Sequence, residues 1–154
     1  MSSNVPELRA ARPFVDIYTD GSYLEKNPTW HVEESPFKVK YITELLRRNA
    51  LPIKSVCEAG CGVGEVLRLL QMELPPETEF TGFDIAPAAH ELSKSRENAH
   101  LHFKFADITA EQNLSFDLIF GPYPEKLVIG TDGAERKGSG RTGVSGPSHI
   151  WIVL

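Results

Sequence analysis

The chain of 154 residues lacks most of the features that mark metalloproteins, membrane proteins and nucleic-acid-binding proteins. Its only cysteines are Cys57 and Cys61, and no further cysteine pair or histidine cluster follows at zinc-site spacing, so we expect no metal. No apolar run approaches the roughly 18 residues that span a membrane. The formal net charge of −5 provides no basic surface for nucleic acid or an anionic membrane. We therefore expect one globular domain, with cysteines suited to the reducing cytoplasm.

A helix is the first regular element that the sequence predicts. Residues 1–29 before it are polar and without a sustained period, so we expect a mobile arm or a surface cover there. Ser35 is a suitable N-cap, Pro36 suits the first helical position, and Pro52 prevents the helix from continuing. Five apolar residues are expected on one face of this helix: Phe37, Tyr41, Ile42, Leu45 and Leu46.

The next part of the chain alternates short apolar strands with helices. Strands are expected at residues 53–59, 79–85, 101–107 and 115–120. Helices are expected at residues 64–74 and 87–99. This order predicts an α/β fold, in which helices sandwich a parallel sheet and ligands bind at the carboxyl ends of the strands.

Three glycines directly follow the first strand, in the stretch VCEAGCGVGE (residues 56–65). A glycine-rich turn before a helix lets a ligand approach the backbone, and the helix N-terminus attracts an anionic group. Phosphate and carboxylate both meet that description. However, the dinucleotide fingerprint G-x-G-x-x-G requires a third glycine where Glu65 stands. Glu58, just before the glycines, would repel a pyrophosphate but attract an ammonium or a sulfonium.

Asp84 ends the second strand, 20 residues beyond Gly64. A carboxylate there can accept hydrogen bonds from both hydroxyls of a ribose, which NAD and S-adenosylmethionine share. Together with Glu58, it favours a zwitterionic, cationic ligand that carries a ribose. Simpler structural roles stay open for each acid: an ion pair with lysine for Glu58, a turn for Asp84 and a helix cap for Asp107.

These motifs resemble those of class I S-adenosylmethionine-dependent methyltransferases, in the same order and spacing over roughly residues 30–120. EAGCGVG matches their E/D-x-G-x-G-x-G motif, FTGFDI resembles the second motif, FADI the third, and FDLIF the fourth strand. The resemblance implies a Rossmann-like fold and S-adenosylmethionine as the cofactor. It also implies a cofactor site with three parts: Glu58, Gly60, Cys61 and Gly62 for the methionine moiety, Asp84 for the ribose, and Ile85, Ala106, Asp107 and Ile108 around the adenine.

The character of the chain changes after Phe120. Seven of the twelve glycines lie from Gly121 onward, and no helical period is visible there. A complete methyltransferase of this class has three further strands, which residues 121–154 are too few to supply with their crossover helices. We therefore expect the cofactor-binding half of the fold at residues 30–120, truncated after the fourth strand. The C-terminal half is absent or replaced by an irregular Gly-rich tail, residues 121–154. The fourth strand would then be an apolar edge open to self-association, unless part of the tail pairs with it.

Three functions fit the sequence. The first is a methyltransferase, for which the acidic charge and the missing nucleic-acid module favour a small-molecule acceptor. The second is a non-catalytic remnant that binds S-adenosylmethionine. The third is a nicotinamide-dinucleotide-binding domain, which Glu58 and Glu65 disfavour. No catalytic residue can be assigned, and we expect Trp30 and His31 to pack locally.

Overall fold

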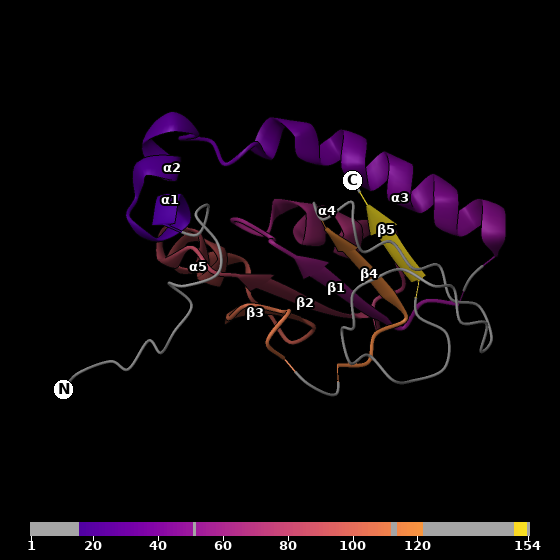
Figure 1. Cartoon of the computed structure of the whole chain (residues 1–154). Coiled ribbons are helices and arrows are strands. Elements are labelled where there is room, and N and C mark those ends of the chain that lie inside the picture. Colours follow the sequence, from indigo (N-terminus) through magenta and orange to yellow (C-terminus); the bar gives the residue numbers. More distant parts are fainter. Residues whose placement is uncertain (1–15, 51, 112–113, 122–149, 154) are drawn as a thin grey trace, which may run out of the picture.

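The computed structural model describes residues 16–50, 52–111, 114–121 and 150–153 (Figure 1). The helices are α1 (Asp16–Thr19), α2 (Ser22–Lys26), η2 (Val32–Glu34), α3 (Ser35–Asn49), α4 (Glu65–Glu73), α5 (Pro87–Ser93) and η3 (Lys94–Arg96). The strands are β1 (Ser55–Ala59), β2 (Glu79–Asp84), β3 (Leu101–Phe105), β4 (Leu118–Gly121) and β5 (Ile150–Val153). The α/β alternation that the sequence predicts is confirmed.

All described strand pairs are parallel, and the sheet order is β3-β2-β1-β4-β5. The chain builds the sheet outward from β1 to β3, then returns to the other side of β1 with β4. This reversal places a topological switch point at β1, where ligands of open α/β sheets bind beside the carboxyl ends of the strands. The glycine loop directly follows β1, so it lies at this point.

The fifth strand is a difference from the sequence prediction, which has the sheet end at the fourth strand. β5 pairs in parallel with β4, from Leu118 opposite Ile150 to Gly121 opposite Val153. Part of the apolar piece HIWIVL therefore satisfies backbone groups of β4 that an open edge would leave unpaired. An open edge at β4 was expected only if no part of the tail paired with it, and β5 supplies that pairing. The other apolar piece, KLVIG, lies outside the described residues.

Helix α3 begins at Ser35 and not one residue later, with Glu34 in the cap position and Pro36 in the first turn. Its buried residues are Ser35, Val39, Ile42 and Leu46. Phe37 and Tyr41, which the sequence places on the buried face, are 78% and 53% exposed. The prediction assigned residues from two different faces to one face. At about 100° per residue, Phe37 and Tyr41 project far from the direction of the buried residues.

The hydrophobic core has two parts, since buried residues of the strands alternate between the faces of the sheet. The larger part joins α3 and α4, which lie side by side in Figure 1, to the sheet. Its sheet residues include Val56, Phe80, Phe103 and Phe120. The smaller part consists of Cys57, Phe83 and Ile119, against which pack Ala106, Ile108, Leu114 and Phe116. Within the described residues, no helix has the length and apolar character needed to cross a membrane.

Candidate functional site

The predicted site residues gather at the carboxyl ends of β1, β2 and β3, where Figure 1 also shows α1, α2 and α5. The glycine loop adopts positive φ angles of 70° at Gly60, 56° at Gly62 and 80° at Gly64. Strand β2 holds its first turn, because the N–H groups of Gly60 and Cys61 both donate to the carbonyl oxygen of Phe83, at 2.7 and 3.0 Å. The loop is therefore tied to the sheet at the point where its backbone turns.

Gly64, the last glycine of the loop, allows α4 to lie close against β3. A Cβ atom at this position would be 2.2 Å from Cζ of Phe103, far inside van der Waals contact. Its positive φ is a second reason why a side chain is not tolerated here. Close helix–strand packing, which the dinucleotide fingerprint assigns to its third glycine, is thus performed by Gly64, one residue before Glu65.

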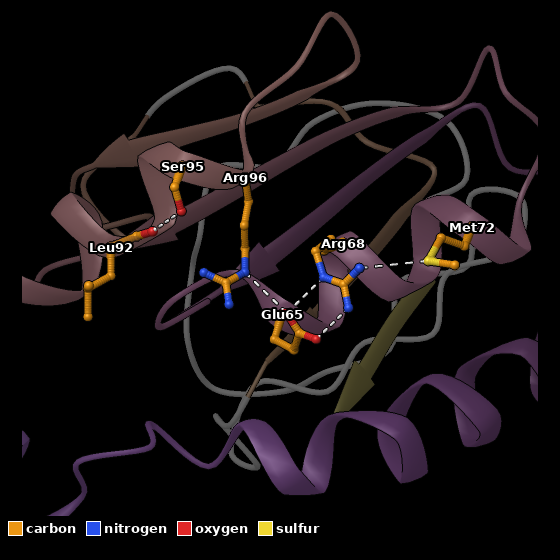
Figure 2. A network of polar contacts seen from close by, with 6 residues as sticks. All are labelled: Glu65, Arg68, Met72, Leu92, Ser95 and Arg96. Carbon is orange, nitrogen blue, oxygen red and sulfur yellow. Dashed lines mark hydrogen bonds and ion pairs between the residues drawn. The ribbon is translucent and has the colours of Figure 1, made fainter.

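Glu65 belongs to an ion-pair network that Figure 2 shows. Its carboxylate accepts hydrogen bonds from Arg68 Nε and Nη2, at 2.9 and 2.7 Å, and from Arg96 Nε at 3.1 Å. These guanidinium groups, Arg68 first, lower the pKa of Glu65 below its usual value. Glu65 therefore joins α4 to η3, and its charge is neutralised by arginines of the protein itself. The charge of the ligand is therefore better inferred from Glu58 than from Glu65.

Glu58 is a buried acid at the end of β1, only 7% exposed. Its Oε2 has no hydrogen-bond partner among the described residues. Burial raises the pKa of Glu58 well above its usual value, an effect that Lys38 opposes and Asp84 reinforces. Within the described part of the chain, no ion pair joins Lys38 to Glu58. The charged form of Glu58 is therefore under-compensated and suited to a ligand that brings a cation.

Asp84 serves the loop directly. Its Oδ2 accepts a hydrogen bond from the N–H of Gly62 at 2.7 Å, and its Oδ1 accepts one from the N–H of Ala86 at 2.8 Å. Burial raises the pKa of Asp84, and these backbone hydrogen bonds oppose the rise. A carboxylate offers about four acceptor positions, so Asp84 keeps acceptor capacity beyond these bonds. The turn role expected for Asp84 is present, and it is compatible with a ligand role.

The residues expected around adenine follow β2 and β3. Asp107 Oδ1 accepts hydrogen bonds from the N–H and the hydroxyl of Thr109, at 2.8 and 2.6 Å, so it caps the turn after β3. Ala106 and Ile108 pack on the smaller core cluster, and Ile85 is half-buried. The fold brings all of them to the same end of the sheet as Asp84. Their contact with adenine stays a prediction.

Trp30 packs locally on Tyr23, as expected, but it also lies against the glycine loop, a contact that the sequence did not predict. Cε3 of Trp30 lies 3.9 Å from the place of a Cβ atom on Gly62, and the rings of Tyr23 and Trp30 have centroids 5.3 Å apart. Burial raises the pKa of Tyr23, and the nearby Tyr18 and Asp84 add to the effect. From Asp16 onward, the polar N-terminal segment is therefore a cover beside the glycine loop. Its cluster of aromatic residues was the available signal.

Two other features lie apart from the site. A hollow of about 690 Å³ lies at the amino ends of the strands, between the ends of α3 and α4. Its lining includes Lys54 and Glu77, and none of the predicted site residues. In the described ranges, no three or more His, Cys, Asp or Glu side chains are grouped to hold a metal ion.

Comparison with known proteins agrees with this geometry. A family model described as a methyltransferase domain matches residues 31–121, which is more than half of the chain. The chain belongs to this methyltransferase family. No curated protein matches its sequence.

The methyltransferase domain is similar in fold to solved structures of plantazolicin methyltransferases. One is BpumL in complex with SAH, with a TM-score of 0.56, 19% identity, and coverage of 70% of this chain and 44% of that one. BpumL in complex with a monoazolic desmethylPZN analog and SAH has a TM-score of 0.55 and 20% identity, and the match covers 68% of this chain and 43% of that one. BamL in complex with a triazolic desmethylPZN analog and SAH has a TM-score of 0.51 and 17% identity, and the match covers 69% of this chain and 42% of that one. The methyltransferase domain thus spans less than half the length of these proteins.

Proposed function

We propose that this chain binds S-adenosylmethionine at the carboxyl ends of β1 and β2 and is the cofactor-binding part of a methyltransferase. The observation that carries the proposal is the buried carboxylate of Glu58, whose Oε2 lacks a partner within the described residues. A buried charge is stable only when it is paired, and the α-ammonium of the cofactor is a suitable partner. Family membership and the solved relatives that hold SAH support the same cofactor.

The other residues present fit the remaining parts of this cofactor. The free acceptor positions of Asp84 suit the two ribose hydroxyls, and Ile85, Ala106, Asp107 and Ile108 line the next part of the same end. When bound, the cofactor supplies a methyl group on a sulfonium, which is already a good leaving group. The protein would then contribute mainly by holding the cofactor in one orientation relative to the acceptor.

The acceptor that we propose is a small molecule. The net charge of −5 argues against a polyanionic substrate such as nucleic acid. BpumL and BamL, which are similar in fold, were solved in complex with desmethylPZN analogs, and this supports an acceptor that is not a nucleic acid. We also propose a cytoplasmic location, because Cys57 and Cys61 are both free and buried.

Calorimetric titration of the purified chain tests the cofactor. We expect heat of binding with S-adenosylmethionine and with S-adenosylhomocysteine, and none with NAD, because a pyrophosphate would approach the Glu58 carboxylate. Binding of NAD alone would establish the nicotinamide alternative. The absence of heat with both adenosyl ligands would contradict the proposal. Methyl transfer to any acceptor would exclude the non-catalytic alternative, whereas binding without transfer would favour it.

A further inference from the structure

The turn that carries Trp30 has an unusual composition for its geometry. The N–H of Val32 donates to the carbonyl oxygen of Thr29 at 3.1 Å, and both central residues have positive φ, 51° at Trp30 and 56° at His31. Such turns are dominated by Gly, Asn and Asp, because each L side chain costs about 1–2 kcal/mol in this region. A turn alone would not require tryptophan here, and strained positions of this kind cluster at ligand clamps.

The strained turn places the indole of Trp30 against the glycine loop. Cε3 lies 3.9 Å from the Cβ position of Gly62, and the ring of Tyr23 packs on the indole with centroids 5.3 Å apart. Gly62 is itself anchored by Asp84 through the 2.7 Å hydrogen bond of its N–H. The indole is therefore held between the N-terminal cover and the part of the loop beside Glu58 and Asp84.

Two buried polar atoms lack partners at this end of the described structure. One is the Nε1–H of Trp30, a donor, and the other is Oε2 of Glu58, an acceptor. An unpaired buried donor is costly, about 1–3 kcal/mol, so a ligand that accepts from it would gain affinity. An α-amino acid offers the complementary pair, a carboxylate to accept and an ammonium to donate.

We propose that Trp30 is a binding residue for the amino-acid end of the cofactor, with its indole N–H donating to the carboxylate while Glu58 accepts from the ammonium. This inference rests on the proposed function and adds to it a residue outside the sequence motifs. It makes Trp30 a specificity determinant, since a ligand without the carboxylate gains nothing from the indole N–H. A hydrogen bond from a neutral donor to a charged acceptor contributes a factor of about 10 or more to affinity.

The test measures two chains against two ligands by calorimetry. The chains are the wild type and Trp30→Phe, which keeps an aromatic ring and removes the N–H. The ligands are S-adenosylhomocysteine and its analogue without the carboxylate, which keeps the ammonium. We expect Trp30→Phe to weaken binding of S-adenosylhomocysteine about 10-fold and to leave binding of the analogue unchanged. His31→Gly is the matched control, because it relieves a positive φ in the same turn without touching the indole, and should leave the ratio of the two affinities unchanged.

The possible outcomes separate this inference from the proposed function. Equal weakening of both ligands by Trp30→Phe would show that Trp30 only packs in the cover, which overturns its role at the carboxylate. No change with either ligand would overturn it as well. If Trp30→Phe does not fold, as judged by circular dichroism, Trp30→Leu provides a second variant without the donor. A wild-type chain that binds neither ligand would instead refute the proposed function itself.

Discussion

At the scale of single residues, the burial of Glu58 is a cost to folding, and we propose that the same burial serves ligand binding. A carboxyl group whose pKa is raised by burial binds more protons in the folded than in the unfolded chain. Its contribution to stability is therefore fully present below its ordinary pKa and is lost as the pH rises through the raised one. The ligand-free chain should lose stability over this window, and the loss is what a bound ammonium would offset.

Replacing Glu58 with glutamine should remove that loss. We expect Glu58→Gln to be more stable than the wild type at pH 8 by about 1 kcal/mol or more, and the gain to shrink towards pH 5. Urea unfolding of the ligand-free proteins at both pH values measures it. Asp84 also has a raised pKa and adds to that of Glu58, so relief of the repulsion between the two carboxylates is part of the expected gain.

The control for Glu58→Gln is Glu77→Gln, which removes the same charge from an exposed position. It should change stability little at either pH. A gain for Glu58→Gln that is the same at pH 5 and pH 8 would contradict the assigned titration. So would an equal gain in the control, which would show that only the net charge matters.

At the scale of elements, the network of Figure 2 fixes η3 to the start of α4. The ion pair of Glu65 with Arg96 joins side chains that are 13% and 25% exposed, so solvent screens it only partly. We expect Arg96→Gln to lower the free energy of unfolding by about 1 kcal/mol at low salt, and by less in high salt. Arg68 keeps Glu65 paired in this variant, so a larger loss is not expected.

The pH dependence of Arg96→Gln has a definite sign. The pKa of Glu65 is lowered in the folded chain, first by Arg68 and also by Arg96. The stability that this interaction contributes is present above the ordinary carboxyl pKa and is lost as the pH falls through the lowered one. The gap between wild type and variant should therefore close in acid. Lys94→Gln is the control, since its ion pair with Glu91 is largely exposed and should have no measurable effect. An equal loss in both variants would contradict the assignment.

Elements that depend on neighbouring residues could be predicted from the sequence. The order strand, glycine loop and helix around Gly60 is local, and so is the position of Asp84 at a strand end. The burial of α3 was predicted less well, because Phe37 and Tyr41 have the right spacing for a buried face. Which apolar stripe of a helix is buried depends on the partner, here α4 and the sheet. The local pattern holds no information about that choice.

At the scale of the whole molecule, the contacts that the sequence did not predict join distant segments. Trp30 meets Gly62 across the cover and the loop, and β5 pairs with β4 after a long glycine-rich segment. Neither contact leaves a periodic signal, because it depends on how the ends of the chain meet the finished sheet. The same contacts decide what lies beside the glycine loop and which strand forms this edge of the described sheet, β5 in place of β4. The tail is therefore a structural part of the domain at least at β5.

Removal of β5 tests that role. A chain that ends at residue 149 would keep the pairing of β4 with β1 but would leave the other edge of β4 unpaired along the buried, apolar run Leu118–Gly121. Loss of even two ladder hydrogen bonds, at about 1 kcal/mol each, should lower the free energy of unfolding by about 2 kcal/mol or more. The exposed edge should also recruit other chains, which light scattering coupled to gel filtration would detect as oligomers.

The control ends at residue 153 and keeps β5 whole, so its oligomeric state and its free energy of unfolding should equal those of the full chain. If the shorter chain kept both the size and the urea midpoint of this control, β5 would not protect the edge of β4. Oligomers in the shorter chain alone would show that residues 150–153 prevent β4 from pairing with other copies of the chain.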